Sequence, residues 1–148
     1  MKRLMYETLK PAGIKRALSS PRILIAESDA FFTRFWRLVF SRIYPRAKII
    51  WAKSKEDVER EIQEHASAGE SIDLVIADTA ILERKTDVAF WKRLSDGPTE
   101  FILTSADKLS RFNRMVTFNE LVSIYIQKPF SFNFCAEAVQ LTLRNIGY

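Results

Sequence analysis

From residue 22 onwards, the chain alternates between short apolar runs and longer amphipathic stretches. The apolar runs are four to six residues long and several are rich in β-branched residues, which is typical of strands covered on both faces of a sheet. They occupy residues 23–26, 48–51, 72–77, 100–104 and 121–126. Because parallel strands need crossover connections, this alternation predicts a five-stranded parallel α/β fold.

Five helices are predicted between and after these strands. Ser28 or Asp29 can cap the first helix, which ends before Pro45. Ser54 begins the second, with Asp57 as a weak capping-box partner. The other three are expected from apolar residues at helical spacing, around residues 88–94, 109–116 and 132–143.

The first 21 residues are predicted to form a basic extension, separate from a domain at residues 22–148. The formal net charge of the chain is +5. Six basic residues and one acidic residue lie in residues 1–22, so the remaining 17 basic and 17 acidic residues cancel. Nucleic-acid binding, which a basic protein suggests, is therefore expected only of the extension and not of the domain.

Composition narrows the class of protein further. The 148 residues suffice for one domain, and 47% hydrophobic with 28% charged residues is typical of a globular protein. A single Cys135 excludes an internal disulfide, and a single His65, expected at the surface, excludes a two-histidine metal motif. No apolar run approaches the roughly 20 residues that span a bilayer. We therefore expect a cytoplasmic protein in which Cys135 belongs to the core.

Side chains that could bind a ligand or take part in a reaction lie at the ends of four predicted strands. Glu27 and Ser28 follow the first strand, Asp78 the third, Thr104 the fourth and Lys128 the fifth. Carboxyl ends of parallel strands meet at one edge of a sheet, where ligands bind. Two carboxylates there require a cation between them, either Lys128 or a divalent metal such as Mg²⁺. Such a site suits a phosphoryl group, whose charge the cations offset.

These residues, in this order, make residues 22–148 resemble a response-regulator receiver domain, the CheY-like module of two-component signalling. The matching features are the apolar strand before Glu27, Asp78 after Leu74-Val75-Ile76-Ala77, Thr104, and Lys128-Pro129-Phe130. The resemblance implies a flavodoxin-like, doubly wound five-stranded parallel sheet of order 2-1-3-4-5 with five helices.

The resemblance also implies a role for each site residue. Asp78 would accept a phosphoryl group from the histidine of a sensor kinase or phosphotransfer protein. Thr104 would bond the phosphoryl oxygens and Lys128 would pair with them. Glu27, Asp78 and the backbone carbonyl of Ala80 would hold Mg²⁺.

Signal output is implied as well. Tyr125 falls where the family has its aromatic switch residue, and the Lys128-Pro129 peptide is expected to be cis. Phosphorylation would alter the face formed by helix four, strand five and helix five, through which the domain would bind a downstream protein or a second copy of itself. Such a receiver is a signalling module and not an enzyme.

Two departures from the family pattern bear on the metal. The family usually ends its first strand with two adjacent acids, whereas this chain has Glu27-Ser28. A hydroxyl is a poorer Mg²⁺ ligand than a carboxylate, so metal binding is expected to be weak. Asp29 is acidic but is placed to cap the next helix. The loop after Asp78 also lacks the family's Met-Pro and Asp-Gly pairs.

Other interpretations of the same residues remain open. Asp78 could cap the following turn while Lys128 forms a structural ion pair, leaving a degenerate pseudo-receiver that binds proteins without phosphorylation. A flavin or nucleotide enzyme on the related fold would need a phosphate-cradling loop after strand one, but residues 27–31 are acidic and bulky. Phe31, Phe35 and Phe40 exceed what one helix face can bury and suggest a partner surface.

Overall fold

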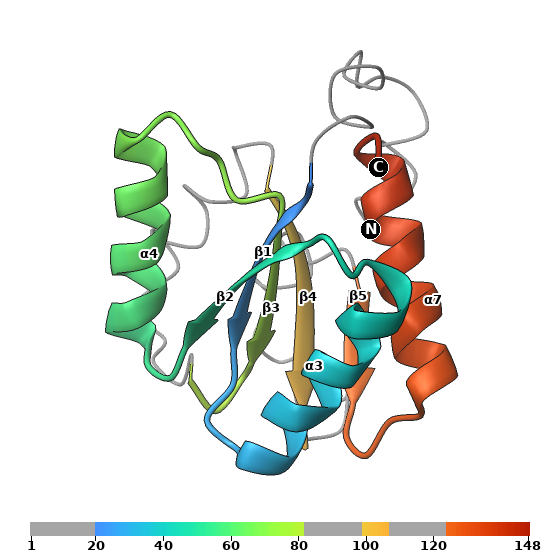
Figure 1. The fold of residues 1–148 in the computed structure, drawn as a ribbon. Helices are drawn as coiled ribbons and strands as arrows, with labels where there is room; N and C mark the ends of the chain where they lie inside the picture. The colour runs from blue at the N-terminus through green and yellow to red at the C-terminus, as the bar shows by residue number, and fades with distance from the viewer. Residues whose placement is uncertain (1–19, 82–98, 107–123) are drawn as a thin grey trace.

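A single parallel sheet organises the protein (Figure 1). The structure, a computed structural model, describes residues 20–81, 99–106 and 124–148. The strand order is β2-β1-β3-β4-β5, with every neighbouring pair parallel. This confirms the predicted doubly wound sheet. The strands are β1 (Arg22–Ala26), β2 (Lys48–Ala52), β3 (Leu74–Asp78), β4 (Glu100–Ser105) and β5 (Ile124–Gln127).

Three helices lie within the described residues: α3 (Ala30–Ile43), α4 (Lys55–Ser67) and α7 (Phe132–Asn145). Helices α3 and α7 cover one face of the sheet and α4 covers the other (Figure 1). None of the helices in the described ranges is long and apolar enough to cross a membrane. Several predicted segments lie outside the described residues. These are the helices around residues 88–94 and 109–116, residues 1–19 of the extension, and residues 121–123 of the fifth strand.

The helix starts follow the predicted capping chemistry. Asp29, and not Ser28, is the cap of α3, because its carboxylate accepts the backbone N–H of Phe31 at 2.7 Å. The Ser54 hydroxyl accepts the N–H of Asp57 at the start of α4. Asp57 in turn accepts a backbone N–H from the residue before the cap, Lys53, at 3.2 Å. Asp29 and Ser54 thereby satisfy amides that the first helical turn leaves unpaired, and Asp57 satisfies an amide just before the cap.

Alternate residues along the strands enter two separate cores. Ile23 and Ile25 of β1 pack on the side of α3 and α7, whereas Leu24 and Ala26 pack on the side of α4. All four are at most 1% exposed. This period of two confirms that the strands are covered on both faces, as their continuous apolar runs predict.

The third strand begins two residues later than predicted, at Leu74. The preceding Asp73 is buried, and its Oδ2 accepts the backbone N–H of Arg22 at 2.8 Å and the hydroxyl of Tyr148 at 2.9 Å. Asp73 therefore ties the C-terminal residue to the start of β1. This contact lies at the edge of the sheet opposite the ends that carry the predicted site.

Three phenylalanines of α3 and His65 differ in their exposure to solvent. Of the phenylalanines on α3, Phe31 is 64% exposed, while Phe35 is partly buried and Phe40 is buried. Of these three rings, Phe31 is therefore the one that is largely exposed to solvent. His65 is partly buried, less exposed than predicted, and its Nδ1 forms a hydrogen bond with the carbonyl oxygen of Glu61 at 2.8 Å.

Cys135 belongs to the core, as predicted, and is fully buried. Burial raises the pKa of its thiol to about 12, so almost no thiolate exists near neutral pH. We expect the native protein not to react with a disulfide reagent such as Ellman's reagent, and to release one equivalent of chromophore once guanidinium unfolds it. Rapid reaction of the native protein would contradict this burial.

Candidate functional site

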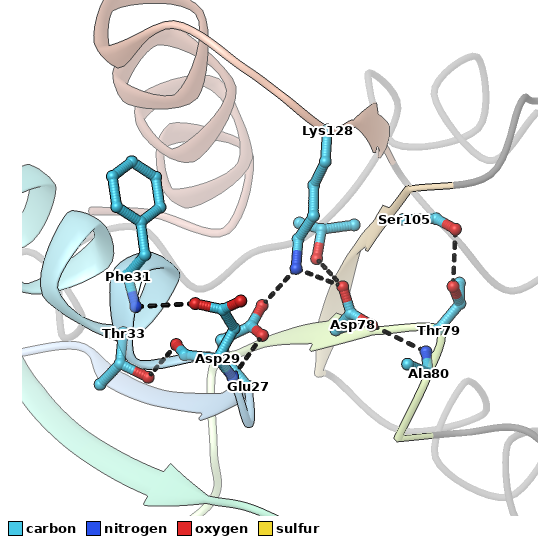
Figure 2. Close-up of polar contacts among 10 residues, drawn as sticks. Glu27, Asp29, Phe31, Thr33, Asp78, Thr79, Ala80, Ser105 and Lys128 are labelled. Carbon is cyan, nitrogen blue, oxygen red and sulfur yellow. Dashed lines mark hydrogen bonds and ion pairs between the residues drawn. The ribbon is translucent and has the colours of Figure 1, made fainter.

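The predicted charged residues meet at the carboxyl edge of the sheet (Figure 2). The Lys128 ammonium lies 2.9 Å from Oε2 of Glu27 and 2.6 Å from Oδ2 of Asp78. Glu27 follows β1, Asp78 ends β3 and Lys128 follows β5, so the parallel topology brings together residues as much as 101 positions apart. The predicted convergence of two acids and one lysine is therefore present.

Each carboxylate oxygen of the pair has a donor. Glu27 Oε1 accepts the backbone N–H of Asp29 at 3.0 Å, and Asp78 Oδ1 accepts the N–H of Ala80 at 2.8 Å. Lys128 bonds the other oxygen of each acid. Thr104 Oγ1 lies 3.4 Å from Asp78 Oδ2, at the long limit for a hydrogen bond. Buried acids that are fully hydrogen-bonded in this way avoid most of the cost of leaving water.

The site is shielded from solvent. Glu27, Asp78 and Thr104 are 4%, 6% and 1% exposed, and the Lys128 side chain is 10% exposed. Burial alone lowers the pKa of Lys128, but its hydrogen bonds to Asp78 and Glu27 outweigh that effect and hold the pKa above its usual value. Lys128 therefore stays protonated throughout the physiological pH range.

An aromatic ring completes the surroundings of the ammonium. Lys128 Nζ lies 3.9 Å from the ring centroid of Phe32, a cation–π contact. Phe32 packs in turn on Phe31 and Phe130, with centroids 5.1 and 5.2 Å away. The sequence places Phe32 on the buried stripe of its helix and gives no indication of this role. Its position in the first turn of a helix that starts at the carboxyl edge places it near the site, but an apolar residue there is usually core.

Ser28 and Ala80 lie at a neighbouring hollow and not between the acids. Both line an open cavity of about 370 Å³ at the start of α4. Ser28 is exposed, and the carboxylate of Asp29 is engaged in capping α3. The remaining lining residues of the cavity are Lys53, Ser54, Lys55, Glu56 and Ile81.

The donor set does not fit Mg²⁺ well in this arrangement. Mg²⁺ needs oxygen ligands in a nearly octahedral shell, but the oxygens of Glu27 and Asp78 already accept hydrogen bonds, two of them from the Lys128 ammonium. Within the described residues, no group of three or more acidic, histidine or cysteine side chains is placed to hold a metal ion. The predicted metal role of Glu27, Asp78 and Ala80 stays a prediction.

Two further predicted features concern strand β5. Tyr125 is half-buried and packs against the core on the α4 side of the sheet, paired in register with Leu103. Its assignment as a switch residue stays a prediction. The Lys128-Pro129 peptide is cis, as expected from the resemblance. Next to this loop, the hydroxyl of Thr79 donates to that of Ser105 at 2.7 Å, a contact that connects the ends of β3 and β4.

No protein-family model and no curated protein matches this sequence. Solved structures do match it. A response regulator from Thermotoga maritima is 18% identical and superposes with a TM-score of 0.67, over 85% of this chain and 99% of that one. A CheY-like response regulator receiver domain protein from Methanospirillum hungatei JF-1 gives 18% and 0.67, over 86% and 97%.

A two-component response regulator from Legionella pneumophila is also similar, at 20% identity and a TM-score of 0.64, over 84% of this chain and 99% of that one. Likeness at these identities establishes a common fold. The sheet order and the helices on both faces agree with it. The chain therefore has the flavodoxin-like fold of the CheY-like response-regulator receiver domains.

Proposed function

We propose that this protein is a signalling receiver of a two-component system in which Asp78 accepts a phosphoryl group. The observation that carries the proposal is the meeting of Asp78 with the ammonium of Lys128 at 2.6 Å and the hydroxyl of Thr104 at 3.4 Å. A carboxylate nucleophile, a fixed cation and a hydroxyl donor together suit phosphoryl transfer, whose catalysis depends mainly on positioning and charge.

The proposed chemistry needs few groups. A carboxylate oxygen of Asp78 attacks the phosphorus of a phosphohistidine on a sensor kinase or phosphotransfer protein. The P–N bond breaks, its electron pair goes to the imidazole nitrogen, and solvent supplies the proton that leaves this ring neutral. Lys128 offsets the charge that the phosphoryl oxygens bring to Asp78, and Thr104 donates to one of them. The protein is changed by this reaction, so we propose a signalling module and not an enzyme.

The donor protein must approach the carboxyl edge of the sheet. Phe31 at the start of α3 and Phe134 at the start of α7 are 64% and 51% exposed, and both helices begin at this edge. We propose that these rings contact the donor protein. Output would follow from a shift of Thr104 and Tyr125 that alters the face formed by β5, α7 and the helix predicted around residues 109–116, which lies outside the described residues.

Phosphoramidate, a small N-phosphoryl donor, tests the proposal without a kinase. We expect intact-mass spectrometry to show the addition of one phosphoryl group per chain, because Asp78 is the site's nucleophile and Lys128 attracts the anionic donor. Alkaline pH should remove the group, since acyl phosphates hydrolyse readily.

Asp29→Asn is the matched control for this experiment. Asn caps helices about as well as Asp, so the variant removes a nearby exposed carboxylate without removing the cap. It should be phosphorylated like the wild type. The proposal fails if the wild type gains no phosphoryl group, or if Asp29→Asn prevents the gain.

A second candidate is a phosphorylation-independent interaction module. The four occupied carboxylate oxygens and the neutral Ser28 favour it, because every oxygen of the two acids already has a donor within the protein. This candidate predicts that the wild type is not phosphorylated and that it binds the same partner as its Asp78→Asn variant.

A flavin or nucleotide enzyme is less well supported. A phosphate-cradling loop after β1 would offer free backbone N–H groups. Here the N–H of Asp29 already donates to Glu27, and the N–H of Phe31 donates to Asp29. Two backbone N–H groups of this loop are therefore already bonded to the loop's own carboxylates.

A further inference from the structure

The geometry points to Lys128 as the resident cation of this pocket: its ammonium, held by Glu27, Asp78 and the face of Phe32, takes the place of a divalent metal between the two acids. The two acids then have a cationic partner, and a donor on each carboxylate oxygen, without Mg²⁺. This inference concerns the pocket before any phosphoryl transfer, so it stands or falls separately from the proposed function.

The three hydrogens of the ammonium provide the first argument. Two of them reach Glu27 Oε2 and Asp78 Oδ2, at 2.9 and 2.6 Å. The ring of Phe32 lies 3.9 Å from Nζ and supplies a third attractive surface in place of water. A side chain that is only 10% exposed is thus nearly fully coordinated by the protein.

Competition with a metal provides the second argument. A divalent ion bound to both acids would have to displace the ammonium from two hydrogen bonds. It would leave the charge of Lys128 buried without a partner, which is strongly unfavourable. Ser28 adds no negative charge to compensate, and the Asp29 carboxylate is occupied at the helix cap. The balance therefore favours the ammonium over the metal.

Phe32 acts here as a positioning residue. Its ring contacts the ammonium that lies between the two acids, and the ring is itself packed on Phe31 and Phe130. Removing the ring should weaken the hold on the ammonium and allow a metal to compete at about 2- to 30-fold lower concentration, the factor that corresponds to a cation–π contact of about 0.5–2 kcal/mol.

Thermal unfolding of the full chain, in EDTA and in a series of MgCl₂ concentrations, tests this inference. We expect the unfolding midpoint of the wild type to be unchanged by millimolar Mg²⁺. Lys128→Met should unfold at a lower temperature in EDTA, because two buried acids lose their counter-ion. Its midpoint should rise with the logarithm of the Mg²⁺ concentration, as binding to the folded state requires.

Two further variants make the result decisive. Lys53→Met removes an exposed lysine at the neighbouring cavity and should behave like the wild type in both buffers. Should Lys128→Met not fold, Phe32→Leu is compared with Phe32→Tyr, which keeps the ring: only the leucine variant should gain stability from Mg²⁺. Stabilisation of the wild type by Mg²⁺ to the same extent as Lys128→Met or Phe32→Leu, or no response of either variant to Mg²⁺, would overturn the inference.

Discussion

Asp78→Asn is expected to abolish phosphoryl incorporation from phosphoramidate and to lower the free energy of unfolding by about 1–3 kcal/mol. The amide has no carboxylate oxygen to attack phosphorus, so the first effect should be complete. The second follows from hydrogen bonding. In the wild type, one oxygen of Asp78 accepts the N–H of Ala80 and the other accepts Lys128. An asparagine offers only one acceptor, so its NH₂ group must face one of these donors.

Intact-mass spectrometry and urea unfolding measure the two effects on the same preparation. The stability loss should be confined to the Asp78→Asn variant, with Asp29→Asn close to the wild type. Phosphoryl incorporation by Asp78→Asn at the wild-type rate would move the acceptor to another residue. Unchanged stability would mean that the two donors do not depend on both carboxylate oxygens.

Trp36→Ala is expected to lower the free energy of unfolding by about 3–5 kcal/mol, the usual range for emptying a large aromatic site in a core. Trp36 is fully buried on the sheet side of α3 and packs against Phe35, Phe40 and Phe130, with ring centroids 5.8, 6.3 and 5.6 Å away. Removing the indole therefore leaves a cavity among these three rings.

Trp36→Phe is the matched control for this prediction. The indole Nε1 is buried and has no hydrogen-bond partner within the described residues, so phenylalanine removes an unsatisfied donor together with part of the ring. Urea unfolding should therefore place Trp36→Phe clearly nearer to the wild type than to Trp36→Ala. Equal losses for the two variants would contradict the prediction, because both remove the N–H and only Trp36→Ala empties the whole ring site.

Much of the fold follows from local patterns. The apolar run at residues 23–26 predicts β1 because a strand covered on both faces cannot carry polar residues, and the residues of this run enter both cores. Asp29 and Ser54 predict helix starts because their side chains can accept unpaired amides. The start of β3 is misjudged, since Asp73 is buried through hydrogen bonds to Arg22 and Tyr148, which no local pattern reveals.

Some residues of the candidate site could be predicted from the sequence and others could not. Glu27, Asp78 and Lys128 could be placed together because strand ends of a parallel sheet meet at one edge, whatever their separation in sequence. Phe32 could not be placed in the site from the sequence, because an apolar residue in the first turn of a helix usually belongs to the core. The path of the Lys128 side chain in the folded structure is what brings its ammonium over the ring.

The partners of the carboxylate oxygens could be predicted only in part, because the sequence leaves Lys128 and a divalent metal as alternatives. The sequence indicates that the acids need a cation, but it does not say which cation they have. The structure places Lys128 on one oxygen of each acid and a backbone N–H on the other. Backbone donors depend on the conformation of the loops after β1 and β3, and tertiary contacts determine such loop conformations more than the local sequence does.

The proposed function is tested most directly by locating the phosphoryl group on the chain. Protein treated with phosphoramidate is reduced with borohydride, which converts an aspartyl phosphate to homoserine, and its peptides are then sequenced by mass spectrometry. The account predicts homoserine at position 78 and unmodified carboxylates at Glu27 and Asp29. Reduction at another acid, or no reduced residue in a protein that stays folded, would contradict it.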